Sequence, residues 1–558
     1  MNSLERYIPH LVHVKNKHFA YKEQAAKSNT SVFGQNMKYI IFLSVSDGNT
    51  RASVSIGIGN SLETSWKNAE TKSLAYINKK RIRPIWIKVD LVINMKVLSK
   101  KEFFKEYNNT KNNYFRKGVS FDRQFNLAFL EQEFLANAFM KDGTFSMNNI
   151  NYYLQSYRDI QYPIREASIN EVVVFDTISY FCDKNNVYPL HSGGLDNGRR
   201  IVEEVDEEIV YQMINSASHF LANQVKPTGE FIYEYYSHLH HGVSWYNMLR
   251  HASTIYSLME AYTVTKNPML EKSIKRALNY LINQAIITRK HPEYGKVSYV
   301  VDKQNNNEIK LGTLGVSILA ITKYAEVFHD DSYMDIAISL GNGILTMQHN
   351  NGQFTHILNA KDLSVKEIHS RAYYDSVAVF SLLRLYELYS DNKWLKTASL
   401  SFDNFIKNER WKNADHWLSY CADEITKYKL EDRYFEFGLK NATYKLDYIF
   451  NRDTTCPQFL ELLMATDQMI QRIRALRKEY LLDKYPIEYI FKTINKRAEH
   501  QLNGYFFPEI AMYMEYPNKI NGSFFTRDHS FRTRIDDIKH YISSYHYYFQ
   551  KVSQVEKV

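Results

Sequence analysis

The segment VSWYNMLRHASTIYSLMEAY, residues 243–262, combines a polar and aromatic start with a later part that is typical of a protein core. Apolar side chains recur in it at three- and four-residue spacing, as on the buried face of a helix, at Leu249, Ile255, Leu258 and Ala261. The polar group at its start consists of Tyr246, Asn247, Arg250 and His251. A core helix with such a first turn indicates that its N-terminal end faces an opening where a ligand binds.

The same kind of helix recurs along the C-terminal part of the chain. The spacing of apolar residues predicts twelve helices, over 205–224, 246–265, 269–288, 311–328, 332–348, 371–390, 392–408, 414–427, 432–449, 456–481, 485–500 and 533–550. Twelve helices with short connections form six hairpins, which bury their apolar faces on both sides when they close into a ring. We therefore predict an (α/α)6 toroid over residues 201–550, without a sheet in that span.

In such a ring the even-numbered helices line the centre, and their N-terminal ends meet at one mouth. These helices begin with WYNMLRHA, KLGTLGVS, SRAYYDSVA, NADHWLSY, DTTCPQFLELL and RTRIDDIKHY. Four of the six starts carry aromatic or ionisable residues where a core helix would carry apolar ones. The phrases TGEF (228–231), NGQF (351–354) and NGYF (503–506) recur between helices, and their Gly residues supply the positive φ of tight turns.

Residues 1–200 have a different texture, with strand and helix signals in alternation. KYIIFLSVS and RASVSIGIG are strand-like and are joined by the turn sequence DGNT. A helix is predicted for SLETSWKNAETKSLAYINKK, and a further strand for RPIWIKVDLVINMKVL. SIGIGNS lacks the spacing of a phosphate-binding loop and is interpreted as a turn. The predicted fold class is therefore mainly α, a C-terminal toroid with a smaller N-terminal α+β domain of unassigned role.

Composition and charge limit the functional classes. The chain has 558 residues and a net charge of +9, from 70 Lys and Arg against 61 Asp and Glu that are interspersed, so no nucleic-acid partner is expected. The three cysteines Cys182, Cys421 and Cys456 stand far apart and suggest neither a disulfide framework nor a zinc site. No secretory segment or membrane span is apparent, and a cytoplasmic location is expected. No cofactor is expected, and the oligomeric state is left open.

Six helical hairpins with Gly-Phe turns, and with aromatic and acidic residues at the inner helix starts, resemble the six-hairpin glycosidase superfamily. The resemblance covers about residues 201–550 and implies an (α/α)6 toroid. The stretch GVSWYNMLRHASTIYSLMEAYTVTKNPMLEKSIKRALNYLINQ is also similar in style to helices of the glucuronyl C5-epimerase C-terminal domain. The resemblance implies a carbohydrate-active enzyme. Because the toroid hosts several chemistries, it leaves hydrolase, lyase and epimerase open.

Each chemistry needs a different set of side chains at the mouth. Hydrolysis of a glycosidic bond needs two carboxyl groups, one of them protonated. Candidate carboxyls are Asp375, Asp415, Asp536 and Asp537, with Glu230 and Glu234 before the second helix. Glu461 lies at a position that can face the ring, but its stretch discriminates little between functions. Abstraction of a proton next to a carboxylate, as in a lyase or epimerase, instead needs Arg or His to neutralise the uronate and Tyr or His to move the proton. Sequence alone does not separate these chemistries, and Asp415 and Asp375 are equally explained by helix capping and the helix dipole.

We assign candidate roles on this basis. The candidate proton-transfer residues are His251, Tyr374, Asp375 and Asp415, and the candidate substrate-binding residues are Tyr246, Asn247, Arg250, Arg371, Tyr373, His416, Trp417 and Asp537. The substrate is expected to be a sugar or polysaccharide, anionic ones included, or an anionic small molecule. No metal site is expected, because His238, His240 and His241 lie on opposite sides of an extended loop. The alternative function is a sugar-binding or assembly component without catalysis.

Overall fold

A computed structural model describes residues 4–34, 38–238, 241–243 and 245–555. The chain forms two compact units, which we describe separately. The first contains Met1–Glu203, Tyr235–His241 and Asn503–Thr533, and the second contains Glu204–Glu234, Gly242–Leu502 and Arg534–Val558. The predicted division at residue 200 lies beside the one at Glu203. The segment 503–533, which the prediction placed in the toroid, belongs instead to the first unit.

The first unit is an antiparallel sheet with helices. Its strands are β1 (Tyr39–Ser46), β2 (Ser53–Gly59), β3 (Trp86–Ser99), β4 (Gly118–Ser120), β5 (Ala128–Phe129), β6 (Met140–Lys141), β7 (Thr144–Phe145), β8 (Glu171–Cys182) and β9 (Val187–Pro189). Its helices are α1 (Ile8–Phe19), α2 (Lys22–Phe33), α3 (Leu62–Lys80), α4 (Lys100–Asn108), α5 (Glu131–Ala136), α6 (Met147–Tyr157), α19 (Pro508–Ala511) and α20 (Pro517–Ile520). The main sheet has the order β2-β1-β3-β8-β4-β5, with β9 beside β8. The predicted strands and the helix after them are confirmed, whereas α1, α2 and β8 were not predicted.

The sheet is buried on both faces, which explains why β1 is apolar at successive positions. Ile41 and Leu43 pack with Trp66 of α3, while Ile40 and Phe42 belong to the core on the opposite face. Gly57 shows why the glycines of SIGIG are needed. A Cβ atom at Gly57 would lie 2.0 Å from the Ser65 carbonyl oxygen, so α3 could not lie this close to β2. These glycines thus belong to a strand under a helix, and the interpretation of SIGIGNS as a turn was wrong.

The second unit consists mainly of the helices that the sequence predicts. They are α7 (Glu207–Asn223), α8 (Met248–Thr265), α9 (Pro268–Tyr280), α10 (Leu311–Phe328), α11 (Met334–Leu345), α12 (Tyr373–Tyr389), α13 (Asn392–Lys407), α14 (His416–Ile425), α15 (Asp432–Thr443), α16 (Leu446–Asn451), α17 (Gln458–Ala475), α18 (Ile487–His500) and α21 (Ile535–Val555). All except the short α16 correspond to the twelve predicted helices. Short strands β10 (Glu234–Tyr236), β11 (His241–Gly242) and β17 (Arg532–Arg534) lie where the chain passes between units.

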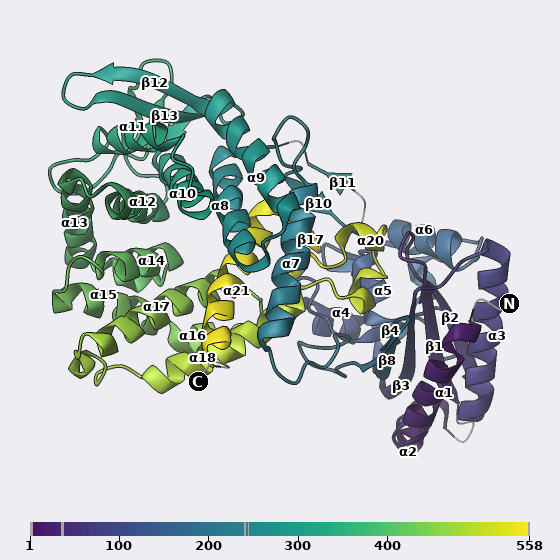
Figure 1. Ribbon diagram of the computed structural model, residues 1–558. Coiled ribbons are helices and arrows are strands. Elements are labelled where there is room, and N and C mark those ends of the chain that lie inside the picture. The colour runs from purple at the N-terminus through teal and green to yellow at the C-terminus, as the bar shows by residue number, and fades with distance from the viewer. Residues whose placement is uncertain (1–3, 35–37, 239–240, 244, 556–558) are drawn as a thin grey trace. The chain divides into compact units, whose positions relative to one another are not determined.

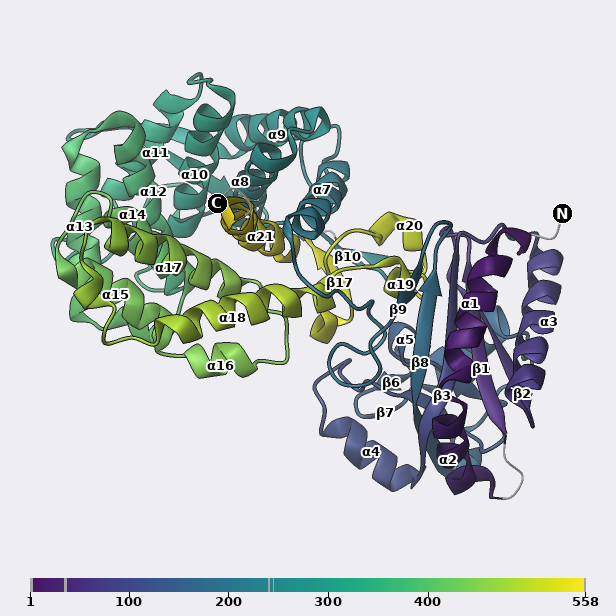
Figure 2. The same ribbon diagram turned by 60° about the horizontal axis from the view of Figure 1, so that its bottom comes forward.

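The inner helices close into a ring. Each inner helix contacts the next one in the order α8, α10, α12, α14, α17 and α21, and α21 contacts α8 again. Each inner helix also packs on neighbouring outer helices, such as α11 on α10 and α13 on α12 (Figures 1 and 2). The predicted closed arrangement of alternating helices is therefore confirmed. The turns at Gly229 and Gly352 have the expected positive φ of 98° and 83°.

The second unit also contains an antiparallel sheet, so the prediction of no sheet within residues 201–550 was wrong. It contains β12 (Ile286–His291), β13 (Gly295–Asp302), β14 (Glu308–Lys310), β15 (Ile357–Asn359) and β16 (Val365–Glu367), in that order. The helix predicted to reach residue 288 ends earlier, in a π-helical turn over Leu281–Ala285. The β-branched run Ile286-Ile287-Thr288 then pairs with residues 298–300.

Within the described part of the chain, α10 is the one helix that is long and apolar enough to cross a membrane. Of this helix, 78% is buried inside the structure. The apolar character of α10 is accounted for by its place in the inner ring, where it packs between α8 and α12.

Candidate functional site

Two histidines from different inner helices lie face to edge in the ring. The rings of His416 on α14 and His540 on α21 have centroids 5.2 Å apart and an interplanar angle of 84°. His540 Nδ1 lies 2.6 Å from Glu461 Oε1 of α17, and Glu461 Oε2 accepts the Tyr420 hydroxyl at 2.8 Å. Because a carboxylate only accepts hydrogen bonds, His540 Nδ1 carries the proton and Nε2 keeps its lone pair.

His416 lies beside a different carboxylate. Its Nδ1 lies at ion-pair distance, 3.2 Å, from Asp415 Oδ1, and its buried Nε2 has no hydrogen-bond partner among the described residues. Asp415 Oδ1 also accepts the Trp417 backbone N–H at 3.0 Å and is the N-cap of α14. Asp415 therefore caps the helix and lies next to the imidazole. The arrangement gives two His–carboxylate pairs, one of them hydrogen-bonded.

Positive charges surround a buried carboxylate beside these histidines. Asp536 Oδ2 lies 2.9 Å from Arg250 Nε and 3.2 Å from Arg534 Nη2, and Asp536 Oδ1 lies 3.5 Å from Lys539 Nζ. Burial alone would raise the pKa of Asp536, but Lys539 and Arg250 outweigh it and hold that pKa well below its usual range. The Asp536 side chain is thus ionised at neutral pH. Its Oδ1 is 4.0 Å from His540 Nε2.

The histidine–glutamate pair is also set up for proton transfer. Burial would raise the pKa of Glu461, yet His540 and His416 lower it overall, so this carboxylate is ionised at neutral pH. Burial and the charge of Lys539 lower the pKa of His540, and Glu461 offsets this only in part. His540 is therefore a neutral imidazole near pH 7, which is the form of a general base.

Aromatic side chains line the space beside this group. A cavity of about 20 Å³ is bounded by Tyr256, Phe380, Trp417, Tyr420 and the polar residues Glu461, Lys539, His540 and Ser543, among others. That volume holds about one water molecule. A sugar ring would have to displace part of the lining, in which the aromatic residues Tyr256 and Trp417 are half-buried.

Part of the predicted site lies at this cluster. Arg250, His416 and Trp417 belong to it directly. Asp537 accepts Arg534 Nη2 at 2.6 Å beside Asp536. Tyr373 lies close enough to Asp536 and Arg250 for their charges to act on its pKa, which burial raises.

Asp375, Tyr374 and Arg371 lie around His356, and Tyr374 also contacts Tyr373. Asp375 Oδ1 accepts His356 Nε2–H at 2.9 Å, and its Oδ2 lies 2.5 Å from Arg410 Nη1. The Ser370 N–H donates to His356 Nδ1, which fixes this histidine as well. Tyr374 packs against the backbone of Gly312, and Arg371 is exposed. In the described structure Asp375 is thus bound to His356 and Arg410, and we assign it a structural part instead of proton transfer.

His251 is buried and fully hydrogen-bonded, which does not suit the proton-transfer role expected from the sequence. Its Nε2–H donates to the Ala277 carbonyl at 3.0 Å, and Tyr246 donates its hydroxyl to Nδ1 at 2.6 Å. Tyr246 in turn accepts the Phe231 N–H at 2.9 Å, and Asn247 caps α8. The first turn of α8 therefore contributes Arg250 to the site, while its other three polar residues hold the helix start in place.

A pH-dependent stability is expected from His251. Burial lowers its pKa to about 4 from 6.5, so its contribution to stability is complete above pH 6.5 and is lost as the pH falls toward 4. The loss amounts to about 3 kcal/mol. In His251→Phe, which lacks two hydrogen bonds, stability is lower by about 1–3 kcal/mol at pH 8, and the difference from the wild type narrows between pH 6.5 and 4. Urea unfolding at several pH values measures this, and a constant difference would contradict it.

The prediction from the sequence did not assign several residues of this cluster to the site. His540 and Lys539 lie four and three residues after Asp536 and share its helix face. The residues predicted on this helix lie in its first turn, and these two lie one turn deeper. Glu461 was noted as able to face the ring, and Asp536 as a carboxyl candidate, but only tertiary structure brings them together with His416.

The cluster also contains donor atoms of the kind that bind metals. One donor atom each from His416, Glu461 and His540 lie within 4.8 Å of one another. Within this set Glu461 already accepts a hydrogen bond from His540, and the ammonium of Lys539 lies 3.5 Å from the neighbouring Asp536. Of the other histidines considered for metal binding, His240 lies outside the described residues, as does the side chain of His241.

No family model matches this chain, and no curated protein sequence does either. Among solved structures, cellobiose 2-epimerase from Bacillus thermoamylovorans is 12% identical, with a TM-score of 0.46 over 62% of this chain and 100% of that one. The GH76 α-mannanase of Bacteroides thetaiotaomicron is 11% identical, with a TM-score of 0.44 over 62% and 97%. A D-mannose isomerase is 12% identical, with a TM-score of 0.44 over 62% and 98%. The chain is thus distantly similar to six-hairpin glycosidase-like enzymes, the resemblance that its order of helices predicts.

Proposed function

We propose that this protein is a carbohydrate-active enzyme that moves a proton at the carbon next to a sugar carbonyl, as an epimerase or isomerase does. One observation carries the proposal. His540 Nδ1 is held by Glu461, His416 Nδ1 lies 3.2 Å from Asp415, and the two rings lie 5.2 Å apart. His416 Nε2 has no hydrogen-bond partner among the described residues, and His540 Nε2 lies 4.0 Å from Asp536 Oδ1. Two such bases can remove a proton from one face of a carbon and return one to another position or face.

The steps follow from the protonation states. His540 Nε2 accepts the C–H proton of the open-chain sugar, and the electron pair moves onto the carbonyl oxygen to give an enediolate. The cations of Lys539 and Arg250 stabilise that negative charge. For return to the other face, His416 Nε2 takes up a proton from solvent and delivers it to carbon, the carbonyl forms again, and the proton on His540 passes to solvent. Glu461 stabilises the charge that His540 gains during the transfer.

Glycoside hydrolysis is supported less well by the same residues. It requires one protonated and one ionised carboxyl group. Asp536 and Glu461 both have lowered pKa values, so both are ionised. Glu260, whose pKa burial raises to about 8, accepts a hydrogen bond from Ser543 and is not among the described residues that line the cavity.

A neutral sugar fits the charges better than a uronate. Arg250, Arg534 and Lys539 supply three positive charges, which pair with Asp536 and Asp537. Glu461, hydrogen-bonded to His540 and Tyr420, supplies a third negative charge. The aromatic residues Trp417 and Tyr420 offer flat apolar faces against which sugar rings pack. The anionic substrates considered from the sequence are therefore not part of the proposal.

Hydrogen exchange with solvent tests the proposed reaction. The protein is incubated in D₂O with aldoses, ketoses and β-linked disaccharides, and deuterium at C2 is measured by NMR and mass spectrometry. The proposal expects deuterium incorporation that survives EDTA treatment. Release of free sugars without deuterium would indicate hydrolysis, and binding by calorimetry without either reaction would indicate the non-catalytic alternative. Either result would overturn the proposal.

A further inference from the structure

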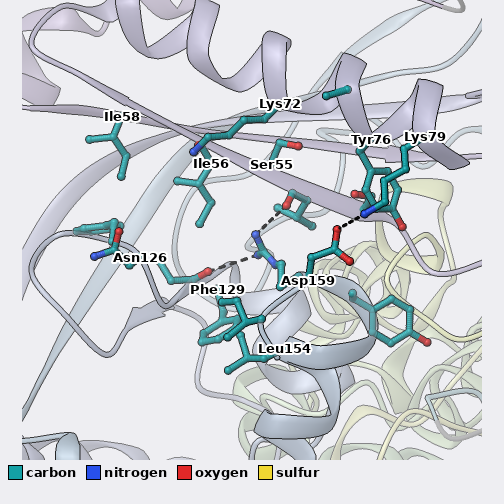
Figure 3. Close-up of a pocket in the computed structure, with 18 residues that line it drawn as sticks. Ser55, Ile56, Ile58, Lys72, Tyr76, Lys79, Asn126, Phe129, Leu154 and Asp159 are labelled. Atoms are coloured by element: carbon teal, nitrogen blue, oxygen red, sulfur yellow. Dashed lines mark hydrogen bonds and ion pairs between the residues drawn. The ribbon is translucent and has the colours of Figure 1, made fainter. Parts of the chain in front are cut away.

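We propose that the first unit holds a second binding site, for a small amphipathic anion, in the gap between two edge strands of its sheet. The order β2-β1-β3-β8-β4-β5 leaves β2 and β5 at opposite edges. The sheet curls so that a single side chain spans both. Arg158 donates from Nη1 to the Val54 carbonyl at 2.7 Å and from Nη2 to the Ala128 carbonyl at 3.4 Å. A cavity of about 460 Å³ lies in this gap (Figure 3), within the size range of small-molecule sites.

The free edge of β2 is already blocked for another strand. The Val54 carbonyl accepts from Arg158, the Ile56 carbonyl accepts from Lys72 Nζ at 2.8 Å, and the Ile58 carbonyl accepts from Asn68 Nδ2 at 2.8 Å. A peptide that added to this edge would have to displace all three side chains. Such protection of an edge strand favours a ligand that is not an extended peptide.

The apolar part of the cavity wall is mainly aliphatic. Its side chains include Ile56, Ile58, Ala75, Phe129, Leu154 and Ile160, and polar or charged residues such as Ser53, Ser55, Asn126 and Lys72 line the rest. Alkyl side chains outnumber aromatic ones in this lining, so an alkyl or acyl chain is the apolar body that we assign to it.

The position of the anionic head group follows from Lys72, a cation in the cavity lining that is not paired with any described carboxylate. Arg158 is paired with Glu133 at 2.5 Å, and Lys79 with Asp159 at 2.9 Å. Among the described residues, Lys72 has no carboxylate within ion-pair distance, and its ammonium makes one hydrogen bond, to Ile56. Two of its N–H donors remain for a ligand. Figure 3 shows Lys72 extending from α3 over Ile56 and Ile58, so that an anionic head at Lys72 places the chain along the aliphatic wall.

Calorimetry with the full-length protein tests the site. The probes are octanoate and octyl phosphate, which share an alkyl chain and an anionic head, with octanamide as the neutral analogue. We expect both anions to bind more tightly than octanamide and less tightly at high salt. Whichever anion binds more tightly indicates whether the natural head group is a carboxylate or a phosphate.

Variants locate the binding. Lys72→Met, which keeps the alkyl stem, is expected to weaken octanoate about tenfold, and Ala75→Trp, which fills the cavity, to abolish binding. Lys67→Met on the same helix is the matched control and leaves binding unchanged, because Lys67 is exposed and does not line the cavity. Thermal unfolding verifies that each variant is folded. The proposal is overturned if octanamide binds as well as octanoate, if Lys72→Met and Ala75→Trp bind like the wild type, or if extended peptides bind there instead.

Discussion

Replacement of His540 by Asn is expected to lower the rate of proton exchange at the substrate carbon by about 10²- to 10⁴-fold. The Asn amide occupies the place of Nδ1 and can still donate to Glu461, whereas the free Nε2 of the wild-type imidazole is lost. The substitution therefore removes the base and keeps the hydrogen bond that now joins α21 to α17. Deuterium incorporation at C2 measures the loss. Substrate binding by calorimetry should change far less than the rate.

The control for this variant is His251→Phe, which alters a buried histidine of the same ring. Because both nitrogens of His251 are bonded within the protein, its replacement should leave turnover within a few-fold of the wild type at pH 8. Thermal unfolding separates a lost base from a lost fold. If His540→Asn stays folded and retains its exchange rate, His540 is not the base and the two-histidine proposal is wrong.

The ring could be predicted because the pattern that specifies each helix lies within that helix's own sequence. Each of the twelve helices carries its own apolar stripe, and the pattern of Leu249, Ile255 and Leu258 on α8 is typical of all of them. Closure then follows because every helix has to bury that stripe against neighbours. The sheet β12–β16 escaped prediction for the opposite reason. Ile286-Ile287-Thr288 continues the periodicity of α9, and only its pairing with Val300 and Tyr299 makes it a strand.

The site could be predicted only in part, since it depends on which helix starts meet. The sequence marked Arg250, His416 and Trp417, which lie in this cluster, because polar groups at the start of core helices are unusual. It gave equal weight to His251 and Asp375, whose partners Ala277 and His356 are contributed by distant segments. The sequence does not distinguish a histidine whose two ring nitrogens are both hydrogen-bonded from one whose Nε2 has no partner. Only the hydrogen-bond partners in the folded structure distinguish them.

Replacement of Glu461 by Gln tests the second half of the proposed machinery. Glu461 orients His540 through Nδ1 and stabilises the imidazolium that forms when His540 accepts a proton. We expect the rate at neutral pH to fall about 10- to 100-fold, as is usual when a carboxylate that orients a histidine is removed. The side chain of Gln has nearly the same size as that of Glu, so the packing with Tyr420 is kept. Exchange rates of variant and wild type measure the effect.

The pH profile gives this variant a signature that a packing defect would not produce. In the wild type, burial and Lys539 lower the pKa of His540, and the negative charge of Glu461 raises it in part. Exchange is therefore expected to persist below pH 6.5 and to decline only as the pH falls through the lowered pKa and His540 becomes protonated. Without the charge of Glu461 that pKa falls further, so the acidic decline should move to lower pH. Tyr420→Phe keeps the carboxylate and serves as the control, with a decline close to that of the wild type. A decline that moves to higher pH in Glu461→Gln would mean that Glu461 does not act on His540 through its charge.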